Sequence, residues 1–324
     1  MTCSKNFFLF FVFFIFLVNC SYQQDNDYKK IRGYHTKTLD VNPEITESPF
    51  EQKELLHGPG KSLQFIGQNA YEHIQNLMAI GYRIPGSYES KKTANYIKKQ
   101  LVVNGWDVDF QEFVHENIII RNIIAKNQED EPSIILGTHY DTREFSDAET
   151  ITKESLFPVP GANDGSSGTA VLLELSRILS INDTSIWIVF FDAEDQGRIN
   201  GWDWSIGSQY FADHLEAHPK NVIIIDMIGD KDLNIYKEKN SAPDLTEKLW
   251  DIADVLGYGN NFINQEKYSM IDDHLPFINK GISTSLVIDF DYPYWHTRND
   301  TIDKISPQSL QVIGNVVEYY IKVD

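Results

Sequence analysis

The stretch SIILGTHYDT at residues 133–142 indicates the fold most directly. It begins with a short apolar run, which is typical of a strand that is buried on both faces of a sheet, and it ends in polar residues. Comparable runs follow as SIWIVFF at 185–191, NVIII at 221–225 and TSLVI at 284–288. Segments with helical spacing lie between these runs, at 165–180, 208–217 and 243–256. Strands that alternate with helices predict a mostly parallel sheet with helices on both faces.

The sequence on either side extends this pattern. Helical spacing occurs at 70–80 and at 87–104, and the second helix is expected to end at Asn104-Gly105. The β-rich runs 106–115 and 118–126 predict a hairpin or an edge pair. A closing helix is expected at 306–321, with Ser306 as N-cap and Pro307 at its first position. We therefore expect an α/β protein, a three-layer α/β/α sandwich with a mixed, mostly parallel central sheet.

The overall charge restricts the class of partner. The 324 residues include 28 Lys and Arg against 47 Asp and Glu, a formal net charge of -19. Such a chain repels phosphate backbones, so we expect no nucleic-acid partner. The acidic surplus also predicts a mild preference for substrates without negative charge. We expect the protein to be a monomer.

The N-terminus has the features of an export signal. Residues 7–18 form an apolar run that follows Lys5 and is too short to span a bilayer. The run ends at 17–20, Leu-Val-Asn-Cys, which resembles the lipobox of bacterial lipoproteins; an ordinary cleaved signal is the alternative. We therefore expect a signal peptide at 1–19, a lipidated Cys20, a tether at 20–66 and a folded domain at 67–324. This predicts an exported lipoprotein, anchored to a membrane on its periplasmic side or in the outer membrane.

Residues of metal-ligand type follow the predicted strands. His139 follows the first buried run, Glu194 and Asp195 follow the second, Asp226 follows the third, and His296 comes after the fourth. Ligands of such sheets bind beyond the carboxyl ends of the strands, so we expect these side chains to converge. Asp164 joins them from a glycine-rich turn, GANDG at 161–165, that precedes a helix. His nitrogen and carboxylate oxygen are the ligands that zinc takes, which predicts a zinc site with Glu194 beside it.

Several motifs together resemble one known family. The segments are RIPGS at 83–87, THYDT at 138–142, PGANDGSSG at 160–168, FFDAED at 190–195, GSQYFA at 207–212, IDMIGD at 225–230, DDH at 272–274 and YWHT at 294–297. In combination they resemble the zinc aminopeptidase superfamily. Within it they are most similar to the glutaminyl-peptide cyclotransferases, the animal type that also occurs in Bacteroidota.

The resemblance implies a ligand set but leaves two chemistries open. Cyclases hold one zinc ion at the positions that match Asp164, Asp195 and His296, and their catalytic carboxylate matches Glu194. Aminopeptidases hold a second zinc ion at the positions of His139 and Asp226. In cyclases the first of these carries no metal and the second joins a hydrogen-bonded acid network. All of these residues are present here, so the ligand set alone does not choose between the two.

Two further positions resemble the cyclases. Trp295 stands directly before the ligand histidine, and Asp272 precedes the Asp-His pair. An indole offers a flat apolar wall for a glutamine side chain. Asp272 near Asp226 and Glu194 could share a proton with them, as acid/base catalysis requires. Alternatively, Trp295 is an aromatic residue of the core and Asp272 caps a loop. Trp204 is either a second contact for the substrate or a lid residue that covers the core.

The resemblance thus implies an acyltransferase. It would convert the N-terminal glutamine of peptides or proteins to pyroglutamate and release ammonia. The first alternative is an aminopeptidase with two zinc ions, in which Glu194 activates a water molecule. The second is a substrate-binding lipoprotein with a degenerate enzyme domain.

Overall fold

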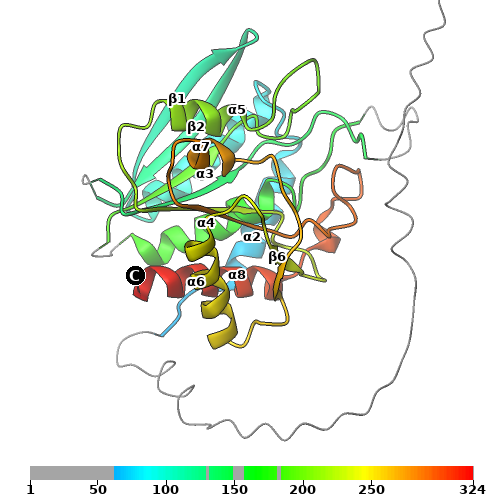
Figure 1. The fold of residues 1–324 in the computed structure, drawn as a ribbon. Helices are drawn as coiled ribbons and strands as arrows, with labels where there is room; N and C mark the ends of the chain where they lie inside the picture. Colours follow the sequence, from blue (N-terminus) through cyan, green and yellow to red (C-terminus); the bar gives the residue numbers. More distant parts are fainter. Residues whose placement is uncertain (1–61, 129–130, 149–156, 181–183, 324) are drawn as a thin grey trace, which may run out of the picture. The chain divides into compact units, whose positions relative to one another are not determined.

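A six-stranded sheet forms the centre of the structure, a computed structural model that describes residues 62–128, 131–148, 157–180 and 184–323 (Figure 1). The strand order is β1-β2-β4-β3-β5-β8. The strands are β1 Asp107–His115, β2 Ile118–Lys126, β3 Ile134–His139, β4 Ile186–Phe191, β5 Asn221–Asp226 and β8 Thr284–Ile288. β3 runs parallel to β4 and β5, and β5 runs parallel to β8. The hairpin β1–β2 adds antiparallel strands at one edge, which confirms the expected mixed, mostly parallel sheet.

Helices cover both faces of this sheet. One layer consists of α2 Gly67–Ile80, α3 Tyr88–Val103, α4 Ser166–Leu179, α6 Pro243–Val255 and α8 Pro307–Val323. The other contains α5 Ile206–Asp213 and α7 Leu275–Asn279, whose Phe211 and Phe277 pack in a separate apolar cluster. The expected three-layer α/β/α sandwich is confirmed (Figure 1).

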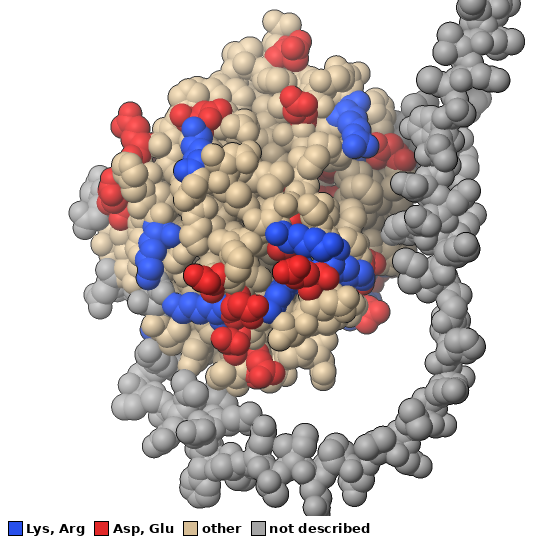
Figure 2. All heavy atoms as spheres, in the orientation of Figure 1, with Lys and Arg blue, Asp and Glu red and all other residues tan. Residues whose placement is uncertain are grey.

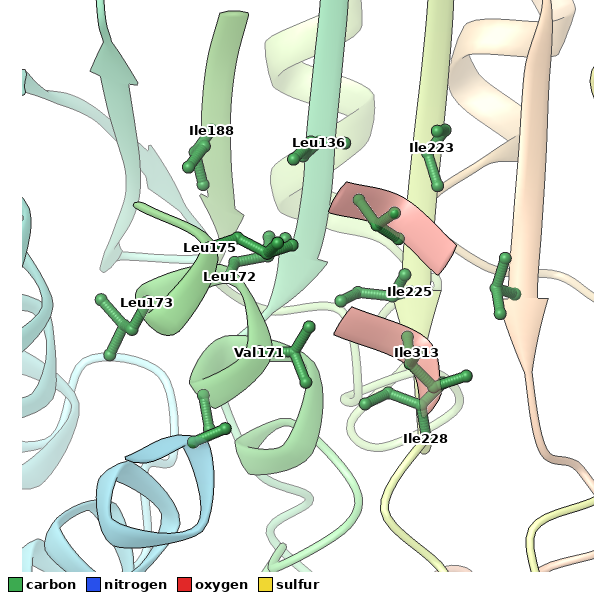
Figure 3. Packing of buried hydrophobic residues seen from close by; sticks show 14 of the residues in the cluster. Leu136, Val171, Leu172, Leu173, Leu175, Ile188, Ile223, Ile225, Ile228 and Ile313 are labelled. Atoms are coloured by element: carbon green, nitrogen blue, oxygen red, sulfur yellow. The ribbon is translucent and has the colours of Figure 1, made fainter. Parts of the chain in front are cut away.

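Alternating side chains of the strands divide the core between the two layers. Leu136 and its neighbours Ile188 and Ile223 pack with α4, as Figure 3 shows. The residues next to them in sequence, such as Ile135, pack on the opposite face with α5 and α7. Each fully buried side chain of this size contributes about 1.5–3 kcal/mol by leaving water. The apolar runs are continuous because both faces of the central strands are buried.

Most element boundaries agree with the sequence within a few residues. Ser306 caps α8, since its hydroxyl accepts a hydrogen bond from the Gln308 amide at 3.1 Å. The helix expected at 208–217 is α5, which begins two residues earlier at Ile206 and ends at Asp213. It begins earlier because the Ile206 amide donates to the Ala193 carbonyl at 3.1 Å, which ties the helix start to the loop after β4.

Four short elements were not expected from the sequence. β6 Ile235–Lys237 and β7 Phe262–Glu266 pair in a small parallel sheet, and the others are α7 and the 3-10 turn Ile302–Lys304. Three to five residues are too few for a periodic pattern to show. The signal peptide 1–19, Cys20 and most of the tether 20–66 lie outside the described residues. None of the described helices is both long enough and apolar enough to cross a bilayer.

Candidate metal centre

The loops that follow the parallel strands turn sharply and bring the acidic residues and histidines together. Non-glycine residues rarely adopt a left-handed backbone, but residues in these turns that do so include Ala193 at φ 58°, Met227 at φ 47° and His296 at φ 54°. Such conformations cost on the order of 1–3 kcal/mol each and gather at functional sites. Ala193 directly precedes Glu194, and Met227 directly follows Asp226. The turns therefore direct these two carboxylates toward the rim of the sheet.

The first group of side chains, which we call the outer cluster, consists of Asp164, Asp195 and His296. One ligand atom from each lies within 4.8 Å of the others. His296 Nε2 is 2.9 Å from Asp195 Oδ1 and 3.8 Å from Asp164 Oδ2. The pKa of Asp195 is raised to about 6, first by burial and then by the neighbouring Asp164, while His296 opposes the shift. The arrangement concentrates negative charge that one imidazole only partly balances.

The second group, which we call the inner cluster, consists of His139, Asp226 and the shared Asp164. His139 Nε2 lies 3.0 Å from Asp226 Oδ1 and 3.1 Å from Asp164 Oδ1. Burial opposes the charged imidazole, but these carboxylates outweigh it and raise the pKa of His139 well above its usual value. This group also has metal-ligand spacing, so the described residues hold two candidate metal sites.

The two clusters differ in how their polar atoms are satisfied. Both carboxylate oxygens of Asp195 and Oδ2 of Asp164 are buried without a hydrogen-bond partner among the described residues. In the inner cluster His139 Nε2 and Asp226 Oδ1 form a hydrogen bond at 3.0 Å. A buried carboxylate oxygen without a donor is costly, and a bound cation removes that cost. The outer cluster, with one imidazole and two carboxylates, therefore fits zinc.

A carboxylate behind each imidazole fixes its orientation. Asp147 Oδ1 lies 3.3 Å from His296 Nδ1, and Asp141 Oδ1 lies 3.3 Å from His139 Nδ1. At His296 the carboxylate at Nδ1 holds the proton there and leaves Nε2 free as a ligand, whereas Nε2 of His139 is engaged by Asp226. The buried Arg143 binds Asp147 through Nε at 2.8 Å and donates Nη1 to the Asp195 carbonyl at 2.9 Å. Arg143 thus connects the backing carboxylate with a candidate ligand.

A second buried arginine supports the turn that presents Asp164. Arg83 is fully buried and donates to the carbonyls of Tyr140 at 2.8 Å and Gly161 at 2.7 Å. On the other side, Asp300 accepts hydrogen bonds from the backbone amides of Asn163 at 2.8 Å and Asp164 at 3.1 Å. The turn is therefore held from both sides by charged groups.

A cavity of about 280 Å³ opens above the outer cluster. His296 lies between two indoles, with ring centroids 3.7 Å from Trp295 and 5.8 Å from Trp204. Phe290 packs edge-on against Trp295 at 5.1 Å. Asp164, Asp195 and His296 line this cavity, whereas His139 is not among its lining residues.

Glu194, Asp272 and the inner-cluster residue Asp226 also line the cavity beside the ligands. Burial raises the pKa of Glu194 well above its usual value; Asp272 adds to the shift, while His139 opposes it. Burial also raises the pKa of Asp272 to about 7, with Asp226 as the next cause. The charge of Asp272 thus acts on Glu194, and carboxyl groups with raised pKa values suit acid/base chemistry near neutral pH.

The structure brings every candidate residue named from the sequence to this one rim, except Cys20, which is not described. Sequence reasoning missed the supporting residues Arg83, Arg143, Asp147 and Asp300. Arg83 lies in the motif RIPGS, which could have drawn attention to it. Arg143 and Asp147 follow THYDT, and their spacing gave no signal of a role. Asp300 belongs to an Asn-Asp-Thr triplet that the sequence suggests is only a turn.

Comparisons with known proteins agree with this geometry. A family model described as peptidase family M28 matches residues 119–321. The aminopeptidase YwaD of Bacillus subtilis is 31% identical over 206 residues, which cover 57% of this chain and 40% of YwaD. A glutaminyl cyclase of Bacteroides thetaiotaomicron has a TM-score of 0.76 at 32% identity, covering 82% of this chain and 100% of its own. A leucine aminopeptidase precursor from that organism has a TM-score of 0.77 at 32% identity, with 82% and 99% covered.

Proposed function

Because the chain belongs to peptidase family M28, we propose that it is a zinc-dependent glutaminyl-peptide cyclotransferase. It would convert the N-terminal glutamine of peptides and proteins to pyroglutamate with release of ammonia. Relatives named as cyclases and as aminopeptidases both occur among its matches. The observation that supports the cyclase is the hydrogen bond of the inner cluster, since His139 and Asp226 satisfy each other while the outer cluster has unpaired oxygens.

The outer cluster would hold a single zinc ion through Asp164, Asp195 and His296. Bound there, zinc supplies a Lewis acid for the γ-carboxamide oxygen of the substrate. Trp295 and Trp204 flank the imidazole of His296 and offer apolar faces to the aliphatic part of the glutamine side chain. Ring closure is intramolecular, so these residues act mainly by alignment and by excluding water.

Glu194 would transfer the proton. Its carboxylate takes a proton from the α-amine as that nitrogen bonds to the carbonyl carbon of the side-chain carboxamide, and it returns the proton to the nitrogen that departs from this carbon as ammonia. The raised pKa of Glu194 suits a group that must both accept and donate. Asp272 and Asp226 surround it with further carboxyl groups and help to keep one proton in the network.

The aminopeptidase is the second candidate, and the metal-ligand spacing of the inner cluster favours it. With zinc at both clusters, Glu194 would take a proton from water instead of from an amine. One experiment separates the two activities: purified protein is incubated with a peptide that begins with glutamine and with one that begins with leucine. Loss of the mass of one ammonia from the first peptide supports the cyclase. Loss of a whole residue from either peptide contradicts it.

We also propose that the protein is exported and anchored by a lipid on Cys20, on the basis of residues 7–20. Membrane fractionation of cells that express the full chain tests this. The intact chain should be found with membranes, and Cys20→Ala should release it from them. A variant that stays with the membrane would contradict lipidation at this cysteine.

A further inference from the structure

The cavity has a buried floor and an exposed mouth. The floor carries the carboxyl groups and His296, all buried. At the mouth the lining residues Arg198, Ser269 and Ile271 are exposed. Arg198 is the only Lys or Arg among the described residues that line the cavity. A lone cation therefore stands where a bound peptide would leave the floor.

The side chain of Arg198 has no partner of its own in the described part of the chain. No ion pair or hydrogen bond joins its guanidinium to a described carboxylate, although several acidic groups lie deeper in the same cavity. Arg143, on the loop after β3, differs: it is buried and donates to Asp147, Asp195 and Gly197. An exposed guanidinium keeps its paired donors available for a carboxylate from outside.

The backbone of Arg198 is nevertheless held in place. Its φ of 67° is left-handed, and its amide donates to the Trp202 carbonyl at 2.7 Å. The preceding Gly197 carbonyl accepts from Arg143 Nη2 at 3.1 Å. A strained conformation kept by such contacts fixes the point from which the side chain extends. The guanidinium can reorient, but it remains at the mouth.

From this placement we infer that Arg198 binds a carboxylate on the residue that follows the N-terminal residue of a peptide substrate. The N-terminal residue occupies the floor, so the next residue passes the mouth. The carboxylate is either an acidic side chain or the free C-terminus of a dipeptide, since a guanidinium binds both alike. The inference uses the proposed function only in taking a peptide with a free N-terminus as substrate.

The overall negative charge does not oppose such a contact. Charges beyond about 8 Å are largely screened at physiological ionic strength, so a direct ion pair outweighs distant acidic groups. On the face shown in Figure 2, acidic and basic side chains are interspersed and do not form one continuous acidic patch. The preference at the mouth is thus set locally by Arg198.

The test compares matched peptides. Gln-Ala is compared with Gln-Ala-amide, which lacks the C-terminal carboxylate, and Gln-Glu-amide with Gln-Gln-amide, which lacks the acidic side chain. In at least one pair we expect kcat/KM to favour the carboxylate by about threefold to fivefold, the size of an exposed ion pair, mainly through KM. Arg198→Gln should abolish this preference, and Arg198→Lys should retain part of it. The pair that shows the preference identifies the source of the carboxylate.

The control is Arg298→Gln, which removes the same charge from a residue that follows His296 but does not line the cavity. The preference for carboxylate peptides should remain in Arg298→Gln. If this variant lost the preference, the preference would come from the overall electrostatic field of the protein, and the inference would be wrong. The inference would also be wrong if the wild-type enzyme showed no preference in either pair of peptides. Calorimetric binding of the four peptides to zinc-loaded Glu194→Gln protein, with and without Arg198→Gln, gives the same ratios without turnover. Should the cyclase proposal fail, this affinity ratio still decides the role of Arg198.

Discussion

The outer and inner clusters use the same residue types and share Asp164, yet they are in different electrostatic situations. In the outer cluster both oxygens of Asp195 lack a hydrogen-bond partner among the described residues, and the imidazole of His296 lies between two indoles at the cavity. In the inner cluster His139 is hydrogen-bonded to Asp226 and does not line the cavity. Equal ligand sets therefore need not be equal metal sites.

The difference follows from what each carboxylate can pair with. A protonated His139 contacts both Asp226 and Asp164, because its Nε2 lies within 3.1 Å of each, and it forms a hydrogen bond with Asp226. His296 faces Asp195 at 2.9 Å, but the geometry leaves those oxygens without a hydrogen bond. A divalent cation would thus stabilise the outer cluster more than the inner one, because it would remove the cost of burying carboxylate oxygens that have no hydrogen-bond donor.

The largest expected effect comes from removing one imidazole at a time. His296→Ala should lose both bound zinc and activity, because it removes a ligand from the cluster that has unpaired oxygens. His139→Ala should keep about one zinc ion per chain and a measurable part of the activity. Zinc content by atomic spectroscopy and ammonia release are the measurements.

The opposite pattern would support the aminopeptidase. In that case wild-type protein binds about two zinc ions per chain, and His139→Ala loses one of them together with all activity. That result would show that the hydrogen bond between His139 and Asp226 does not decide the metal count.

Glu194→Gln should have the next largest effect. It removes the proton acceptor but no ligand, so kcat should fall by about 10²- to 10⁴-fold while zinc content stays the same. The matched control is Glu266→Gln, an exposed residue of β7 that should leave both values unchanged. A fall in zinc content in the Glu194 variant would mean that this carboxylate binds metal and belongs to the outer cluster.

Asp147→Asn should weaken the outer cluster without touching a ligand. Asp147 holds Nδ1 of His296 at 3.3 Å, and loss of such a backing carboxylate typically lowers metal affinity about 10- to 100-fold. Competition with a zinc chelator measures the change. Asp213→Asn, at an exposed carboxylate paired with Lys280, serves as the control. An unchanged affinity in the Asp147 variant would show that Trp204 and Trp295 alone orient the imidazole.

The sequence predicted much of this arrangement for a physical reason. Buried strands are continuous apolar runs, and the residues at the end of each run must lie at the sheet rim, so His139 and Asp226 could be located from the sequence. Asp147 and Arg143 could not be located in this way. Their roles depend on contacts with His296 and Asp195, which are far away in the chain.

The distinction between the clusters was also beyond the sequence. Motifs give residue types and spacing, but whether an oxygen has a donor depends on rotamers and backbone turns. Asp300 illustrates this, since only the folded structure shows that it accepts the amides of Asn163 and Asp164. Arg198 likewise has no motif, because its importance comes from being unpaired at the cavity mouth.

The smallest effect is expected from substituting Asp289, a buried carboxyl group outside both clusters. It serves as a reference for a buried carboxyl group that has no imidazole beside it. Asp289 is fully buried and accepts backbone hydrogen bonds from Asn234 at 2.8 Å and Asp291 at 3.1 Å. Burial raises its pKa to about 7. A raised pKa means that the folded state holds the proton more tightly than the unfolded one. The stabilising contribution is therefore complete at pH below about 4 and is lost as the pH rises toward 7.

Asp289→Asn should remove this dependence. Relative to wild type, the free energy of unfolding of the variant should rise between pH 5 and pH 8, by on the order of 1 kcal/mol. Urea unfolding of the zinc-loaded proteins at both pH values measures it. The difference matters for the clusters, because Asp289 has backbone donors but no imidazole or metal to balance its charge. A variant whose stability relative to wild type does not change with pH would mean that two backbone amides suffice to hold a buried carboxylate. The unpaired oxygens of Asp195, which lack even those donors, would then be the stronger sign that a cation belongs in the outer cluster.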